Sequence, residues 1–160
     1  MTIAGLTGHQ DLGAPATVAW VRRQIEATVR NHKVELGVTA LAIGADQLFA
    51  SVLAEHKISY LAIVPCNRYE ETFDRAGLAK YRHFLRLATQ TCVLHFEEPS
   101  EKAYYEAGKN IVRRSTLLIA VWDGKPAKGL GGTGDIVQYA QRESKIIVHI
   151  NPGLRKVQLL

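Results

Sequence analysis

The chain has 160 residues, of which 47% are hydrophobic and 22% are charged, a composition typical of one globular domain with its own core. No apolar run approaches the roughly 20 residues that span a bilayer, and the segment from Met1 to Gly5 lacks the basic region of a signal peptide. We therefore expect a cytoplasmic domain over residues 1–160 with no membrane partner.

The net charge of +5 is concentrated in the second half of the chain. Residues 1–80 carry eight Lys and Arg against eight Asp and Glu, whereas residues 81–160 carry twelve against seven. This excess suits an anionic partner, but it is scattered, so nucleic acid is not an expected partner. Cys66 and Cys92 have no CxxC spacing and no neighbouring histidine cluster. They predict reduced thiols, and neither a metal site nor a cofactor is expected.

Predicted strands and helices alternate along the chain. The predicted strands are short apolar runs: Thr2 to Leu6, Val38 to Ile43, Ile58 to Val64, Thr91 to Phe96, Leu117 to Trp122 and Ile146 to Ile150. Apolar residues at helical spacing predict the intervening helices, over residues 15–31, 44–56, 78–88, 104–112 and 135–143, with a short helical piece at 70–74. Asn151-Pro152-Gly153 ends the last strand.

Each predicted strand is apolar throughout, which indicates a parallel sheet covered by helices on both faces. We therefore predict an α/β fold, a single Rossmann-like doubly wound domain with a mainly parallel sheet of about six strands. Ligands of such folds bind outside the carboxyl ends of the strands. The turns after the first, second, third and fifth strands are therefore expected to meet in space.

The most distinctive of these turns is the glycine-rich segment from Asp123 to Asp135. It follows a buried strand and precedes a helix, so its backbone N–H groups can form a concave site for an anion. Four glycines lie within Gly129 to Gly134, and glycine lets the backbone approach a ligand closely. Thr133 adds a hydroxyl and an N–H. We expect this loop to hold a phosphate, and the alternative is a flexible surface turn.

The candidate ligand-binding residues are polar residues and glycines at these four turns. They are Thr7, Gly8, His9 and Gln10, then Gly44 and Asp46, then Arg68 and Tyr69, and finally Asp123, Gly131, Gly132, Thr133, Gly134 and Asp135. No catalytic residue is assigned among them.

Several of these residues also have a structural explanation. Asp46 and Asp135 fall in the first turn of a predicted helix, where a carboxylate can cap free N–H groups, although Asp46 could instead accept a hydrogen bond from a ribose hydroxyl or a base. His9 could donate to a phosphate, act as an acid, or be inert. Arg68 could pair with a phosphate and Tyr69 could stack on a base, or the pair could be ordinary surface and core.

Three segments in order resemble the SLOG superfamily, which joins the DprA/SMF proteins and the Lonely Guy phosphoribohydrolases. They are Gly5-Leu6-Thr7-Gly8-His9, Ile43-Gly44-Ala45-Asp46, and Val121-Trp122-Asp123-Gly124 leading to Gly131-Gly132-Thr133-Gly134-Asp135. The resemblance runs from Ile3 to about Ile150. It implies a Rossmann-like fold that binds nucleotides or nucleotide-derived ligands, with some members hydrolysing glycosidic bonds and others serving as sensors. It also implies a homodimer or another homo-oligomer, because members often pair through helices beside the site.

The chain departs from the Lonely Guy enzymes at one position. Their motif PGGxGTxxE ends in a catalytic glutamate, and laid on Gly131 to Gly134 it places Asp135 at its threonine and Gln138 at its glutamate. A glutamine cannot act as a general base or stabilise an oxocarbenium-like centre with a negative charge. Hydrolysis by that route is therefore not expected.

These observations favour a binding domain or sensor for a nucleotide or nucleotide-derived small molecule, with the phosphate on the Gly131 to Gly134 loop. The alternative is an N-glycosidase that cleaves a nucleoside monophosphate or a dinucleotide, with Asp46, Asp123 or Asp135 stabilising positive charge at the ribose. A third hypothesis, single-stranded DNA binding of the DprA kind, is disfavoured by the scattered basic residues and the 8% aromatic content.

Overall fold

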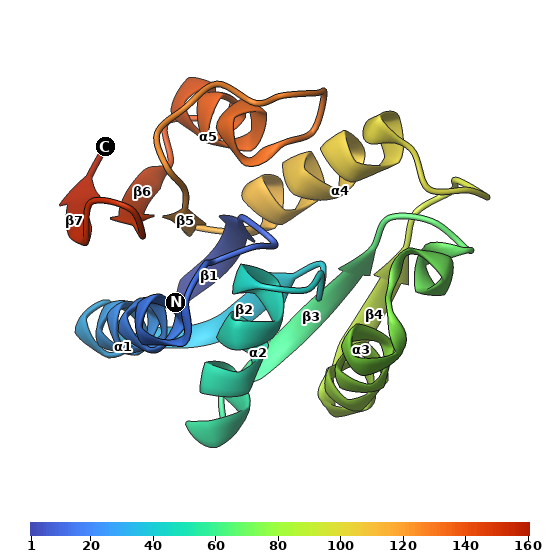
Figure 1. Cartoon of the computed structure of the whole chain (residues 1–160), viewed down its shortest axis with the longest axis horizontal. Helices are drawn as coiled ribbons and strands as arrows, with labels where there is room; N and C mark the ends of the chain where they lie inside the picture. Colours follow the sequence, from blue (N-terminus) through green and yellow to red (C-terminus); the bar gives the residue numbers. More distant parts are fainter.

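The computed structural model describes residues 1–160 as a seven-stranded sheet with helices on both faces (Figure 1). The strands are β1 (Thr2–Gly8), β2 (Val34–Thr39), β3 (Ser59–Val64), β4 (Gln90–Val93), β5 (Leu117–Val121), β6 (Ile146–Asn151) and β7 (Lys156–Leu159). The helices are α1 (Pro15–Asn31), α2 (Ala45–Glu55), the 3-10 turn η1 (Tyr69–Thr72), α3 (Arg75–Leu87), α4 (Glu101–Arg114) and α5 (Thr133–Arg142). None of the helices combines the length and apolar character that crossing a bilayer requires.

The strand order β4-β3-β2-β1-β5-β6-β7 contains one reversal of direction. The chain builds outward from β1 to β4, and α4 then carries it back to β5 on the other side of β1. All neighbouring strands are parallel except β6 and β7, which are antiparallel. The predicted doubly wound α/β fold is therefore confirmed, and β1 lies at the switch point where such sheets open a crevice.

The two faces of the sheet are covered by different helices. Helices α1, α2 and α3 lie on one face and α4 and α5 on the other (Figure 1). In β5, Leu117, Ile119 and Val121 pack into the core beneath α1 to α3, whereas Leu118 and Ala120 pack against α4 and α5. Both sets are buried, which explains why this strand reads as a continuous apolar run instead of an alternating one.

Strand β2 lies four residues earlier than the sequence predicts. The predicted strand is Val38 to Ile43, but β2 ends at Thr39 and the residues after it form the loop into α2. Leu41 in this loop has φ 58° and is nevertheless completely buried. The apolar pattern continued past the end of the strand because the loop itself contributes to the core, so periodicity could not locate the strand's end.

Strand β1 ends at Gly8 instead of Leu6, so Thr7 and Gly8, predicted as turn residues, are the last residues of the strand. Two further differences lie at the edges of the sheet. Strand β4 is Gln90–Val93 instead of Thr91 to Phe96, and the short strand β7 was not predicted. The predicted stop after β6 is a tight turn, in which Asn151 Oδ1 accepts hydrogen bonds from the N–H groups of Gly153 and Leu154, each at 3.1 Å. All four residues of β7 are exposed and mix polar with apolar side chains, so the sequence has no apolar run there that would predict a strand.

A close contact between α4 and α5 gives a first prediction. A Cβ added at Gly108 would overlap Cδ1 of Ile136 and lie 2.7 Å from its Cγ1. Overpacking of this kind costs about 1–3 kcal/mol, which exceeds the gain of about 1 kcal/mol in helix propensity. We expect Gly108→Ala to lower the free energy of unfolding in urea, and Ile136→Val, which removes Cδ1, to restore part of it in the double variant. Strictly additive effects would contradict the contact.

Candidate functional site

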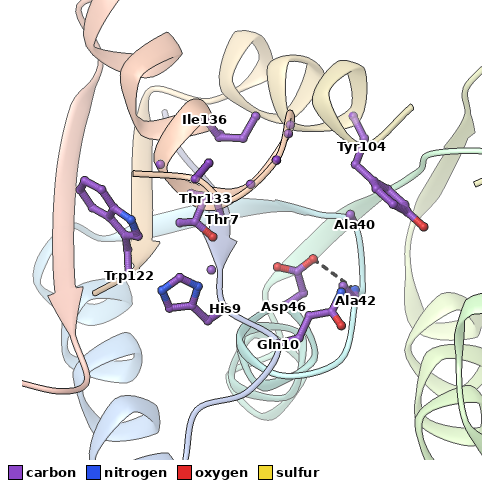
Figure 2. A pocket seen from close by; sticks show the side chains of 18 of the residues that line it. Thr7, His9, Gln10, Ala40, Ala42, Asp46, Tyr104, Trp122, Thr133 and Ile136 are labelled. Atoms are coloured by element: carbon purple, nitrogen blue, oxygen red, sulfur yellow. Dashed lines mark hydrogen bonds between the residues drawn. The ribbon is translucent and has the colours of Figure 1, made fainter. Parts of the chain in front are cut away.

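A pocket of about 840 Å³ occupies the crevice above the carboxyl end of β1 (Figure 2). Its walls come from the loops after β1, β2, β3 and β5 and from one side of α4. The predicted residues that line it are Thr7, Gly8, His9, Gln10, Asp46, Tyr69, Asp123, Gly131, Gly132, Thr133 and Gly134. The structure thus brings together turns that are far apart in the sequence.

Arg68, a predicted phosphate partner, lies outside the pocket lining. Its guanidinium pairs with Glu71 at 2.8 Å and with Glu98 at 3.0 Å on the exposed surface. The hydrogen bond to Glu71 is the main cause of the raised pKa of Arg68. The positive charge that the sequence offered to a phosphate is already paired with carboxylates.

Gly44 and Asp135 also lie outside the pocket lining, and both shape its walls. Gly44 has φ 83°, and a Cβ there would overlap the carbonyl of Gln10, so only glycine fits. Asp135 does not cap the first N–H groups of α5. Its Oδ2 instead accepts a hydrogen bond from the Gly131 N–H at 3.1 Å, which holds the glycine-rich loop against the helix.

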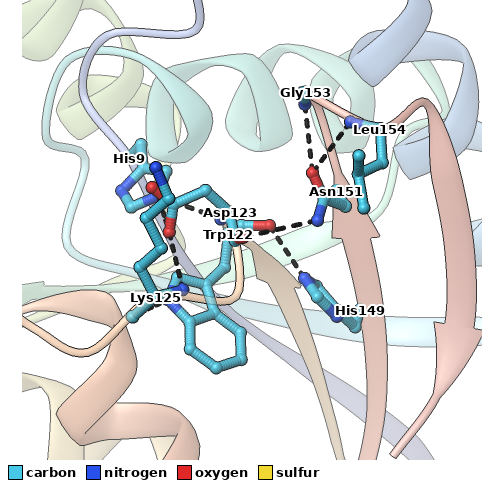
Figure 3. A network of polar contacts seen from close by, with 8 residues as sticks. All are labelled: His9, Trp122, Asp123, Lys125, His149, Asn151, Gly153 and Leu154. Carbon is cyan, nitrogen blue, oxygen red and sulfur yellow. Dashed lines mark hydrogen bonds and ion pairs between the residues drawn. The ribbon is translucent and has the colours of Figure 1, made fainter.

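His9 ties together the loops on both sides of β1. Its backbone N–H donates to the Val121 carbonyl and its own carbonyl accepts from the Ala45 N–H, each at 3.1 Å. Its ring Nε2 accepts a hydrogen bond from the Asp123 N–H, also at 3.1 Å (Figure 3). The same Nε2 lies 3.4 Å from the Asp123 carboxylate, and Nδ1 has no hydrogen-bond partner within the chain.

The first residues of the β5–α5 loop are fixed by several further bonds (Figure 3). The Asp123 carboxylate accepts a hydrogen bond from the Lys125 N–H at 2.9 Å, and this bond, with the nearby His9, lowers the pKa of Asp123. The indole N–H of Trp122 donates to the Lys125 carbonyl, and the ring of His149 lies 2.8 Å from the Trp122 carbonyl. The carboxylate of Asp123, a predicted ligand-binding residue, is therefore already bonded within its own loop.

The glycines of the loop are required by packing within the protein. A Cβ at Gly134 would lie 2.9 Å from the Ala127 nitrogen and 3.1 Å from the Lys125 carbonyl oxygen. A Cβ at Gly131, where φ is 87°, would lie 2.8 Å from the backbone nitrogen of Tyr105. The loop folds closely on itself and on α4, so these contacts account for the glycines without a ligand.

The N-terminus of α5 offers free donors to the pocket. The N–H groups of Asp135 and Ile136 bond to the Gly132 carbonyl, but those of Thr133 and Gly134 have no hydrogen-bond partner within the chain. Both residues line the pocket. Unpaired N–H groups at the positive end of a helix dipole favour an anion, so this wall can hold a phosphate or a carboxylate.

Asp46 is the buried carboxyl of the pocket, with only 7% of its surface exposed. Its Oδ2 accepts a hydrogen bond from the Ala42 N–H at 3.1 Å, and Figure 2 shows the carboxyl pointing into the pocket. Burial raises the pKa of Asp46 to about 7, and the bond from Ala42 opposes this only in part. Asp46 thus bonds to the loop before α2 and does not cap that helix. Because its pKa is close to neutral pH, its carboxyl can gain or lose a proton there.

Aromatic side chains line the pocket, including some that the sequence analysis did not select. Tyr69 is buried and makes edge contacts with Phe73 at 5.1 Å and Tyr81 at 5.4 Å between ring centroids. Tyr104, from α4, and Trp122 lie on opposite sides of the pocket (Figure 2). The α4 wall was missed because only the return crossover places that helix over β1. No group of three or more His, Cys, Asp or Glu side chains could hold a metal ion.

No protein-family model and no curated protein matches the chain. Solved structures with the same fold include DprA from Streptococcus pneumoniae, with a TM-score of 0.67 and 14% identity over 93% of this chain. DprA from Helicobacter pylori has a TM-score of 0.67 and 12% identity over 92% of the chain. The molybdenum cofactor binding protein from Rippkaea orientalis has a TM-score of 0.60 and 15% identity over 94% of the chain.

The chain spans only part of these proteins. It covers 50% of the Streptococcus DprA, 64% of the Helicobacter DprA and 76% of the Rippkaea protein. At these identities the similarity is one of fold, and the Rossmann-like fold that the resemblance implies is confirmed.

Asp46 gives a prediction for the pH dependence of stability. Between about pH 4 and pH 7 the folded protein keeps a proton on Asp46 that the unfolded chain has released, so this group lowers stability as the pH rises through that window. Asp46→Asn removes the ionisable carboxyl and with it this fall in stability as the pH rises. We expect the stability of the variant relative to wild type to rise by up to roughly 4 kcal/mol between pH 4 and pH 8.

Urea unfolding at pH 4, 6 and 8 measures this difference. Glu35→Gln is the matched control, because Glu35 is an exposed carboxylate at the start of β2 with no hydrogen bond or ion pair. The same rise in Glu35→Gln would show that it does not come from the buried carboxyl of Asp46. A difference between Asp46→Asn and wild type that is the same at all three pH values would contradict the raised pKa.

Proposed function

We propose that the chain binds a nucleotide or nucleotide-derived small molecule, with a phosphate at the N-terminus of α5. The observation that carries this proposal is the pair of unpaired N–H groups of Thr133 and Gly134 at the wall of an 840 Å³ pocket. The pocket lies at the switch point of a doubly wound sheet, where ligands of such folds bind. Its volume falls within the usual range for small-molecule sites.

The charges of the pocket support one orientation of the ligand. Lys125 and Lys128 line it on the glycine-rich loop, and Nδ1 of His9 has no partner within the chain. Asp46 belongs to another wall, where its carboxyl would repel a phosphate when ionised. The phosphate therefore belongs at α5, and the uncharged part of the ligand extends toward Asp46.

Proteins that share the fold bind ligands of different kinds. The Helicobacter pylori DprA binds single-stranded DNA, and the Rippkaea orientalis protein binds the molybdenum cofactor. The fold therefore does not by itself select a ligand for this chain. The choice of a small nucleotide rests on the pocket's own donors and aromatic walls.

The proposal is tested by thermal unfolding with AMP, ADP, ATP, NAD, ADP-ribose, cyclic nucleotides and a thymidine oligonucleotide. A nucleotide present at about 100 times its Kd should raise the Tm by about 5 to 10 °C. Gly134→Ala should abolish the rise, because its Cβ would displace the Lys125 to Ala127 segment that packs on the start of α5.

Gly153→Ala is the matched glycine control. A Cβ at Gly153 comes no closer than 3.6 Å to Asn151 Oδ1, so the variant should keep the full shift in Tm. If no nucleotide raises the Tm of the wild-type protein even at millimolar concentration, the proposal is wrong. A rise with the oligonucleotide alone, lost at high salt, would favour DNA binding instead.

Asp46 favours a second candidate function, N-glycoside hydrolysis. A carboxyl with a pKa of about 7 holds a proton at neutral pH in a large fraction of molecules and can act as a general acid toward a leaving base. Gln138, at the position of the Lonely Guy glutamate, is exposed and does not line the pocket. The chain therefore has no acidic side chain at that position of α5, whereas the Asp46 carboxyl lines another wall of the pocket.

Chromatography after long incubation separates the two functions. A bound nucleotide recovered unchanged indicates a binding domain or sensor. Release of free base and sugar phosphate indicates a glycosidase, and in that case Asp46→Asn should lower the rate about 100-fold or more while the nucleotide still protects the variant against thermal unfolding.

A further inference from the structure

The protein leaves one oxygen of the Asp46 carboxyl without a partner. The side chain is more than nine-tenths buried, Oδ2 is bonded to the Ala42 N–H, and Oδ1 has no hydrogen bond. No Lys, Arg or His forms an ion pair with it. Oδ1 opens onto the pocket, since the structure contains no buried side-chain oxygen that lacks a hydrogen-bond partner. A ligand in the pocket can therefore reach this oxygen and supply a donor to it.

The position of this carboxyl is fixed by a rigid loop. The Gln47 side chain donates to the carbonyls of Leu41 and Gly77, each at 3.2 Å, and the Leu41 N–H donates to Thr39 Oγ1 at 3.2 Å. The left-handed backbone of Leu41 is unfavourable for a residue with a Cβ and is retained within this network. Asp46 is therefore held in one orientation toward the pocket, as specific recognition requires.

The sheet sets the separation between Asp46 and the anion site. Asp46 follows β2 and Thr133 follows β5, and these strands flank β1. Adjacent strands are about 4.8 Å apart, so the ends of β2 and β5 are separated by about 10 Å. In Figure 2 Thr133 lies beside Thr7, and Asp46 stands apart from both. A nucleotide with its 5′-phosphate at α5 would cross the end of β1 and bring its sugar to Asp46.

The sugar hydroxyls are the group that best suits this carboxyl. An ionised carboxylate only accepts hydrogen bonds, and the 2′- and 3′-hydroxyls of ribose offer two adjacent uncharged donors. A second phosphate would be repelled at this wall. In dinucleotide-binding Rossmann folds an acidic residue beyond the second strand likewise bonds the ribose 2′-hydroxyl, although there the phosphate lies on the first loop.

We propose that Asp46 makes the pocket selective for ribonucleotides over 2′-deoxyribonucleotides by accepting a hydrogen bond from the ribose 2′-hydroxyl. The proposal rests on the proposed function, because it requires the phosphate of a nucleotide at α5. It goes further by naming the sugar and the residue that distinguishes it.

The test is a calorimetric comparison of four matched pairs: AMP, GMP, CMP and UMP, each with its 2′-deoxy counterpart. One hydrogen bond to a charged group corresponds to roughly 10- to 100-fold in affinity, so at pH 8 the deoxynucleotide of the best-bound pair should bind wild type more weakly by that factor. In Asp46→Ala, which leaves no side-chain donor or acceptor at this position, the two members of the pair should bind within about threefold of each other.

Glu35→Gln again serves as the control, because it removes one exposed carboxylate far from the pocket and should keep the full discrimination. Equal affinity of wild type for both sugars would overturn this proposal and leave the proposed function standing. Discrimination that persists in Asp46→Ala would overturn the assignment to Asp46. If neither sugar binds wild type in any pair, binding of nucleoside monophosphates fails and the selectivity proposed here fails with it, while the thermal screen with the other nucleotides decides the proposed function. The wild-type comparison tests the selectivity even if Asp46→Ala does not fold.

Discussion

The pocket depends on His9, which holds the loops on both sides of β1 at fixed positions. Its backbone bonds to Val121 and Ala45, and its ring bonds to the Asp123 N–H. The backbone bonds could be made by any residue, but the ring bond needs an acceptor that reaches across to the β5–α5 loop. One histidine therefore connects the wall that carries Asp46 to the wall that carries the free N–H groups at the start of α5.

These two walls differ in their electrostatics, and the difference gives the pocket a direction. The start of α5 presents N–H donors, whereas Asp46 presents a carboxyl that is buried at a cost to the stability of the free protein. Left-handed residues such as Leu41 are often found at functional sites, and the Asp46 oxygen that lacks a hydrogen bond opens onto the pocket. The β2–α2 loop thus holds the Asp46 carboxyl in a fixed orientation as a hydrogen-bond acceptor, at a cost to the stability of the free protein.

The glycine-rich loop illustrates how one pattern can have a different cause from the one first inferred. Glycines between Gly129 and Gly134 suggested close approach to a phosphate, but the structure shows that Gly131 and Gly134 are needed because the loop packs against Tyr105 and the Lys125 to Ala127 segment. The donors that remain for a ligand are those at the start of α5. Their availability follows from the helix terminus and not from the glycines themselves.

The sequence by itself determined the alternation of strands and helices and the doubly wound fold, because continuous apolar runs require burial on both faces. It also placed Thr7 to Gln10, Asp46 and Thr133 at one edge of the sheet, since the carboxyl ends of parallel strands share that edge. Only the tertiary structure decided that Arg68 is paired elsewhere, that α4 forms a wall, and that Asp46 is buried with one oxygen free. Those facts depend on contacts between residues distant in the chain, which local patterns do not encode.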